Sequence, residues 1–294
     1  PFLDSLYTRS ISFRNFYSAG IHTNHGLYAT LYSFPAMMKR NLMKGSVIPR
    51  YSGLPTVLKE NGYYNLFFMT HEGQYDNMNA FFRTNGYDEV FSQEDYPVDK
   101  VVNSFGVQDD FLYDYAIPVL NQRAATGQPF FATLLSISNH PPYVIPPFFH
   151  PKTSEPEMQI VEYADWALRQ FFEEARKQPW FDNTIFVLEG DHGKLVGDAE
   201  CELPESYNHI PLMIYSSRIQ PEEKTAFGGQ VDIQPTILGL LNIDYLQNNF
   251  GVDLLKEERP CMFYTADNMV VGRNDTLLYL YLSLIHISEP TRRT

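Results

Sequence analysis

Short, continuous apolar runs that alternate with helix-like stretches constrain the possible folds of this chain more than any other feature. The clearest runs cover residues 64–69, 130–137, 184–189 and 212–215. A continuous apolar run is typical of a strand buried on both faces, as in a parallel sheet that helices cover on each side. The pattern therefore predicts an α/β fold with a mostly parallel central sheet.

Helical periodicity is clearest over residues 161–177, which Pro179 terminates. Apolar side chains recur there at three- and four-residue steps and form one predicted stripe: Val161, Ala164, Leu168, Phe171 and Ala175. Further helices are expected over residues 54–60, before the cap pair Asn61-Gly62, and near residues 233–241.

The two ends of the chain differ in character from its middle. Hydrophobic residues make up 44% and charged residues 19%, and no repeat or low-complexity linker interrupts the chain, so residues 1–281 are expected to form one domain. Residues 282–294 (LSLIHISEPTRRT) resemble a translated cloning adapter and are interpreted as a non-native tail. Because the chain begins at Pro1, we expect it to be truncated at its N-terminus.

The formal net charge of -13 disfavours binding to nucleic acid and to anionic membrane surfaces. An anionic substrate would need a local cation to overcome this field, and a divalent metal ion would supply one. The two cysteines, Cys201 and Cys261, define neither a zinc-binding spacing nor a disulfide framework. No apolar run reaches transmembrane length, so any signal or membrane anchor would lie upstream of Pro1.

Asp191 and His192 are the most informative polar residues, because they follow directly after the apolar run 184–189 and Gly190. In open α/β sheets, ligands bind at the carboxyl ends of the strands. A carboxylate oxygen beside an imidazole nitrogen suits Mn or Zn. An Asp-His pair on a loop is usually structural, but the strand and the flanking glycines favour a metal site.

Two further histidines are expected at the same edge of the sheet. His140 follows the run 130–137, and His209 precedes the run 212–215. The ordinary alternatives are a loop histidine before a proline turn for His140 and a buried structural histidine for His209.

Thr23 lies in a loop flanked by Gly20 and Gly26. Its hydroxyl could act as a nucleophile if a metal ion lowered its pKa. His22 and His25 flank it and are interpreted as solvent-facing or supporting residues rather than ligands. Taken alone, this motif is weak.

The order of these motifs resembles that of the lipoteichoic acid synthase group in the alkaline phosphatase/sulfatase superfamily. The resemblance runs from about Ser18 to Val271 and is carried by the threonine loop, Asn-His-Pro-Pro, Asn-Thr-Ile-Phe-Val with Gly-Asp-His-Gly, Asn-His-Ile-Pro-Leu and Val231-Asp-Ile-Gln-Pro-Thr-Ile-Leu238. It implies an alkaline-phosphatase-like three-layer α/β/α sandwich. It also implies an extracytoplasmic location, with the missing anchor in the membrane.

The resemblance assigns roles to individual residues. In that family a threonine nucleophile and an Asp-His pair bind one Mn or Zn ion together with an upstream glutamate, and Thr23, Asp191 and His192 match these positions. His140 matches a substrate-binding or second-metal histidine. His209 resembles a second-site histidine of the phosphoethanolamine transferase branch, which allows a second Zn. The glutamate should precede Thr23 by more than the 22 residues present, so this chain is expected to lack one ligand and to be inactive by itself.

The substrate is less constrained than the chemistry. Lipoteichoic acid synthases hold glycerol phosphate with a Trp and an Arg in the segment that resembles residues 71–79. This chain retains His71 there but has Asp76 and Asn77 in the clamping region, and Arg83 is either a substitute clamp or a surface helix residue. No cysteine begins the Cys-x-Pro-x-Arg pattern of formylglycine sulfatases, which disfavours that chemistry.

Three functions follow as hypotheses. The first is metal-dependent transfer of a phosphoglycerol-like head group from an anionic lipid or a phosphorylated glycan, through Thr23. The second is a phosphodiesterase, phosphatase or sulfatase of the same superfamily that uses water as the acceptor. The third is a non-catalytic envelope module that binds a polyanion or a partner in the same pocket.

Overall fold

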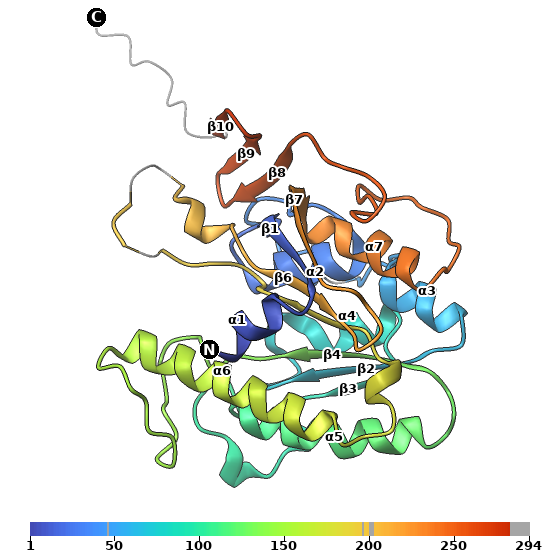
Figure 1. Cartoon of the computed structure of the whole chain (residues 1–294), viewed down its shortest axis with the longest axis vertical. Helices are drawn as coiled ribbons and strands as arrows, with labels where there is room; N and C mark the ends of the chain where they lie inside the picture. Colours follow the sequence, from blue (N-terminus) through green and yellow to red (C-terminus); the bar gives the residue numbers. More distant parts are fainter. Residues whose placement is uncertain (46, 196, 200–202, 283–294) are drawn as a thin grey trace, which may run out of the picture. The chain divides into compact units, whose positions relative to one another are not determined.

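The computed structural model describes residues 1–45, 47–195, 197–199 and 203–282 (Figure 1). The chain divides into two compact units, each built from three segments that alternate along the sequence. Unit 1 comprises Pro1–Ser12, Met43–Val187 and Met213–Glu223, and unit 2 comprises Phe13–Leu42, Leu188–Leu212 and Lys224–Thr294. Each unit is described by itself.

A three-stranded parallel sheet forms the centre of unit 1. Its strands are β2 (Tyr64–Met69), β3 (Glu89–Phe91) and β4 (Phe130–Leu135), in the order β3-β2-β4. Strand β2 lies between the other two and pairs in parallel with both. Its side chains from Leu66 to Met69 are fully buried, as the continuous apolar run predicted.

The helices of unit 1 are α1 (Phe2–Tyr7), α3 (Leu54–Glu60), α4 (Met78–Thr84), α5 (Asp109–Ala124) and α6 (Pro156–Ala175). Helix α3 has the bounds that the sequence predicted, and Gly62 follows it with a φ of 84°, in the left-handed region where glycine is favoured. Helices α5 and α6 lie side by side (Figure 1), joined by a Tyr163 hydroxyl that donates to Asp110 over 2.6 Å.

Short 3-10 turns occur in both units and cover Tyr75–Asn77, Gln93–Asp95, Val98–Lys100, Phe181–Asn183, Glu205–Tyr207 and Gln230–Asp232.

The predicted stripe of α6 is wrong by one position in its first half, whereas Phe171 and Ala175 are buried as predicted. Val161 is 41% exposed, whereas its neighbour Ile160 is completely buried. The buried residues of the helix are Ile160, Tyr163, Ala167, Phe171, Phe172 and Ala175. The large Tyr163 ring faces inward and holds this register, because its hydroxyl reaches Asp110 on α5. The helix also begins five residues earlier than predicted, at Pro156, a residue suited to the first turn.

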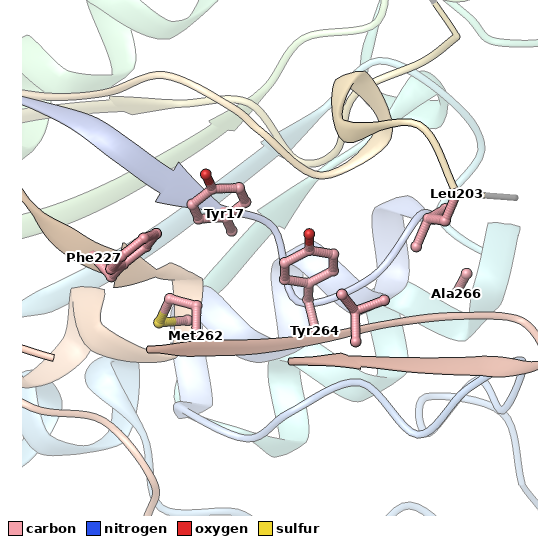
Figure 2. Packing of buried hydrophobic residues seen from close by; sticks show 7 residues of the cluster. Tyr17, Leu203, Phe227, Met262, Tyr264 and Ala266 are labelled. Atoms are coloured by element: carbon pink, nitrogen blue, oxygen red, sulfur yellow. The ribbon is translucent and has the colours of Figure 1, made fainter. Parts of the chain in front are cut away.

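Unit 2 contains α2 (Thr23–Tyr32), α7 (Ile233–Leu240) and an antiparallel sheet of β8 (Met262–Ala266), β9 (Met269–Arg273) and β10 (Leu278–Leu282). Its core cluster consists of Tyr17, Leu203, Phe227, Met262, Tyr264, Ala266 and Val271. Figure 2 shows the Tyr17 and Tyr264 rings face to face in this cluster, with centroids 5.4 Å apart. This stack fixes the end of β1 against β8.

A third group of strands has the order β5-β6-β1-β7: β1 (Ile11–Tyr17), β5 (Phe186–Glu189), β6 (Leu212–Tyr215) and β7 (Glu222–Gly229). Each of these strands contributes residues to both units. The α/β class predicted from the sequence is confirmed, and β2 and β6 have the predicted bounds, while β4 and β5 are two residues shorter than expected.

The predicted tail begins at Leu282, which is the last residue of β10, and residues 283–294 lie outside the described residues. None of the helices in the described ranges is long and apolar enough to cross a membrane.

Candidate functional site

Thr23 is the first residue of helix α2, not a loop residue as the sequence suggested. His22 precedes it in an extended conformation, with φ -132° and ψ 148°. The helix escaped prediction because it is buried around nearly its whole circumference and therefore has no single apolar stripe. The backbone N–H groups of a first helical turn lack partners within the helix, so the Thr23 hydroxyl lies where anions are favoured.

Asp191 and His192 follow β5 and meet Thr23 in unit 2. The Thr23 hydroxyl donates to Asp191 Oδ2 over 2.7 Å, and His192 Nε2 lies 3.5 Å from the same oxygen. The backbone N–H of His192 donates to the other carboxylate oxygen over 2.9 Å. One hydroxyl, one carboxylate and one imidazole therefore converge, and we name these three residues the Thr23 cluster.

The His192 ring is held in a defined orientation. Its Nδ1 lies 2.7 Å from the carbonyl oxygen of Gly193. A carbonyl can only accept, so Nδ1 carries the proton, and the Nε2 of the neutral ring keeps its lone pair. That nitrogen is the one near Asp191, as a metal ligand requires.

Two glycines allow the segments around the Thr23 cluster to approach closely. A Cβ on Gly26 of α2 would lie 2.4 Å from the carbonyl oxygen of Asp191, and one on Gly193 would lie 1.9 Å from that of Ser206. Both distances are far below van der Waals contact. Any larger residue at either position would displace the backbone next to Asp191.

Two polar residues near the cluster were not singled out from the sequence. Glu189 ends β5 and accepts a 2.5 Å hydrogen bond from Thr30 of α2, and its burial raises the pKa of the carboxyl to about 8. Gln230 is completely buried and contacts the Asp191 backbone. Neither belongs to a local pattern, although Gln230 directly precedes the Val231–Leu238 motif.

Within the described ranges, no side-chain hydrogen bond joins the histidines beside Thr23 to the Thr23 cluster. His22 pairs with Asp267, with 2.7 Å between Nε2 and Oδ1. His25 is buried, and burial together with the nearby His22 lowers its pKa to about 4, so its ring is neutral at physiological pH. These positions agree with the supporting roles expected for both residues.

His209 is used differently from His192. Its Nε2 lies 2.7 Å from the Arg14 carbonyl oxygen and must carry the proton, and its ring stacks on Tyr17 with centroids 5.1 Å apart. Its Nδ1 lies 3.8 Å from a Glu205 carboxylate oxygen. The described contacts therefore favour a structural histidine and do not join it to the Thr23 cluster.

His71 and His140 both belong to unit 1. Each directs Nδ1 at the carbonyl oxygen of the next residue, Glu72 over 3.1 Å and Pro141 over 2.6 Å. His71 is buried, which lowers its pKa, whereas His140 is exposed. The His140 ring contacts Phe105, with centroids 4.1 Å apart, and both residues line a small cavity.

The predicted substrate-clamping segment of unit 1 has unusual backbone geometry. Asp76 and Asn77 both have positive φ, 51° and 61°, which asparagine and aspartate tolerate better than most residues. The Asp76 carboxylate pairs with Lys44 over 2.6 Å. Arg83 donates to Asn79 and to two backbone carbonyls, so its contacts agree with the surface-helix alternative.

The acidic and imidazole ligands near Thr23 are few. Over the described parts of the chain, no three His, Cys, Asp or Glu side chains form a group that could hold a metal ion. The Thr23 cluster contains only one acid and one histidine, and its third oxygen is a hydroxyl. Of the two cysteines, Cys201 lies outside the described residues and Cys261 is free.

Comparison with known proteins agrees with the motif order. Lipoteichoic acid synthase 1 of Bacillus subtilis is 27% identical over 266 residues, which cover 82% of this chain and 40% of that protein. Phosphoglycerol transferase I of Xanthomonas campestris is 25% identical over 99% of this chain and 44% of its own length. The chain thus spans less than half the length of these relatives.

Solved structures share the fold. A protein in the alkaline phosphatase superfamily from Vibrio parahaemolyticus matches 96% of this chain and 71% of its own, with a TM-score of 0.88 and 30% identity. The lipoteichoic acid synthase LtaP from Listeria monocytogenes matches 94% of this chain and 76% of its own, with a TM-score of 0.80 and 23% identity. The family model for sulfatases matches residues 1–243. The chain therefore belongs to the sulfatase family, in the alkaline phosphatase superfamily.

Proposed function

We propose that this protein transfers a phosphoglycerol-like head group from a lipid or glycan donor, with Thr23 as the nucleophile. The observation that carries the proposal is the 2.7 Å contact between the Thr23 hydroxyl and Asp191, beside His192 Nε2. The relatives' names supply the substrate class, since they are lipoteichoic acid synthases and a phosphoglycerol transferase. We also propose, from the same relatives, that the protein acts outside the cytoplasm and is held at the membrane.

The donor atoms of the Thr23 cluster fit a Mn or Zn ion. Thr23 Oγ1, Asp191 Oδ2 and His192 Nε2 combine two oxygens with one imidazole nitrogen, and the Nδ1–H bond to Gly193 leaves Nε2 free to coordinate. When bound, the cation would lower the pKa of the Thr23 hydroxyl and offset the charge of the phosphate, which the net charge of -13 otherwise repels.

The chain's own residues account for the transfer in two half-reactions. Thr23 Oγ1 attacks phosphorus, the bond from phosphorus to the donor oxygen breaks, and the donor leaves as an alcohol. The proton of Thr23 departs along its hydrogen bond to Asp191, and the leaving oxygen takes up one proton, so the step is proton-neutral. An acceptor hydroxyl then attacks phosphorus, the bond to Thr23 breaks, and Thr23 regains its proton.

The test is product analysis with the natural full-length protein, Mn²⁺ and phosphatidylglycerol vesicles, with and without a glycan acceptor. Transfer predicts equal amounts of diacylglycerol and of acceptor carrying phosphoglycerol, and phosphatidylcholine vesicles serve as the control donor. Free glycerol phosphate in place of modified acceptor would instead support the hydrolase hypothesis. No cleavage of any phosphodiester would contradict an enzymatic role.

A further inference from the structure

Gln230 joins the two segments that carry the reactive groups. Its Oε1 accepts a 2.8 Å hydrogen bond from the backbone N–H of Ala19, four residues before Thr23. Its Nε2 donates to the carbonyl oxygens of Gly190, over 3.1 Å, and Asp191, over 2.8 Å. One buried side chain thus bonds the segment that leads into α2 and the segment that leaves β5.

Only a side chain that ends in a primary amide can accept one of these hydrogen bonds and donate the other two. A carboxylate has no donor for the two carbonyl oxygens, and a lysine or arginine has no acceptor for the Ala19 N–H. Because the site is buried, any of these backbone groups left without a partner would be costly. The three bonds therefore explain why a glutamine occupies position 230.

The contact between the two segments is tight as well as bonded. A Cβ on Gly26 would lie 2.4 Å from the Asp191 carbonyl oxygen and 3.0 Å from Gln230 Nε2. Helix α2 therefore lies directly against the backbone that Gln230 holds. A small shift of either segment would change the distance between Thr23 Oγ1 and Asp191 Oδ2.

Gln230 is itself held firmly. Two residues later, Asp232 is completely buried and accepts from the backbone N–H of Gly229 over 3.0 Å. Its carboxylate also accepts three contacts from the guanidinium of Arg259, one at 2.6 Å and two at 2.9 Å. The turn Gln230–Asp232 is thus anchored on both sides of the glutamine side chain.

We propose that Gln230 is a positioning residue that sets the spacing between the Thr23 hydroxyl and the Asp191 carboxylate before any cation or substrate binds. This inference rests on the proposed function for its consequence in catalysis, but its structural content is independent of the metal. It predicts that loss of the Gln230 amide loosens residues 18–26 and 188–193 together.

The experiment compares Gln230→Met with Gln234→Met in the full-length protein. Methionine keeps the side-chain length and volume and removes the amide. Gln234 is a matched control, because it is 1% exposed and lies one turn later, on α7. Among the described residues, no hydrogen bond joins it to Ala19, Gly190 or Asp191. The first readout is amide hydrogen exchange of the metal-free protein, followed by peptide mass spectrometry.

Faster exchange in both segments, 18–26 and 188–193, is expected for Gln230→Met and in neither for Gln234→Met. Calorimetry should then show Mn²⁺ affinity reduced roughly 10- to 100-fold by Gln230→Met alone, as for other residues that orient ligands. Wild-type exchange in Gln230→Met, or the same increase in both variants, would overturn the inference. If the wild-type protein binds no Mn²⁺, the metal assignment fails, and the exchange result still decides the role of Gln230.

Discussion

Thr23 and Asp191 of unit 2 are held by different means from His71 and His140 of unit 1, although His192 of the Thr23 cluster also bonds to the carbonyl oxygen of the next residue. Thr23 and Asp191 are 168 residues apart in the sequence and bond through their side chains. His71 and His140 instead bond to the carbonyl oxygen of the next residue, and their rings contact the aromatic rings of Tyr75 and Phe105.

This difference indicates that the Thr23 cluster can react, whereas His71 and His140 can orient a substrate. In the Thr23 cluster a hydroxyl, a carboxylate and an imidazole converge through long-range contacts, where glycines let the backbone segments approach closely. Such chemically different groups can exchange protons and share a ligand. A histidine fixed only by its neighbour presents one nitrogen in a defined direction and needs a substrate to give it a role. We therefore expect variants in the Thr23 cluster to affect turnover and variants at His140 to affect binding.

The largest effect is expected for Thr23→Ala. Without the nucleophile, kcat of the full-length protein should fall at least about 10³-fold, since a positioned site retains only residual catalysis. Mn²⁺ binding should persist through Asp191 and His192. His140→Ala should instead raise KM with little change in kcat. An equal loss of kcat in both variants would erase the distinction between the two regions.

Arg259→Ala tests the support behind the Thr23 cluster. The guanidinium faces a completely buried Asp232 carboxylate, so its removal leaves an uncompensated charge and should cost about 3–5 kcal/mol of unfolding free energy. Arg169→Ala on α6 is the control, because its ion pair with Glu173 is exposed and screened by solvent, so its loss should change the unfolding free energy little. Urea unfolding of both variants measures the difference, and similar losses would refute the buried-pair account.

His192 and His209 of unit 2 provide a sharper comparison. His192→Ala should weaken Mn²⁺ binding at least about 10-fold, because Nε2 is free to coordinate. His209→Ala should leave the affinity unchanged, since its Nε2 donates to Arg14. Calorimetry on the two variants is the measurement. A loss of affinity in His209→Ala would restore the second-site role that the sequence suggested.

The smallest effect concerns Asp109, at the start of α5 in unit 1. Burial raises the pKa of its carboxyl, although the N–H groups of Ile137 and Ser138 favour the charged form. The pKa of an aspartate in the unfolded state is about 4, and above that pH the native state binds more protons than the unfolded state. The free energy of unfolding therefore falls as the pH rises from about 4 through the raised native pKa of Asp109. Asp109→Asn should remove this slope, because an amide does not titrate. Unfolding at several pH values tests it, and an unchanged slope would contradict the assignment.

The sequence predicted those features that depend on local patterns. Continuous apolar runs gave the positions of β2 and β6 because both strands are buried, and the Gly-Asp-His-Gly motif predicted the end of β5. Helix α5 was missed because Pro118 lies within it and its apolar residues form no clear stripe.

Other features come only from folding. The buried Val231–Leu238 motif was recognised, but the role of Gln230 depends on Ala19 and Asp191, which are distant in the sequence. His209 carries its proton on Nε2, whereas His192 carries it on Nδ1. This difference also depends on a residue distant in the sequence, because the Arg14 carbonyl oxygen accepts the His209 bond. No periodicity or spacing encodes such contacts.

The most direct test of the central claim is to trap the covalent intermediate. The full-length protein is mixed with Mn²⁺ and phosphatidylglycerol, quenched in acid within one turnover and digested, and its peptides are measured by mass spectrometry. Our account predicts a phosphoglycerol adduct on the hydroxyl of Thr23 that disappears when acceptor is added. Turnover with no adduct at Thr23, or with an adduct on another residue, would contradict it.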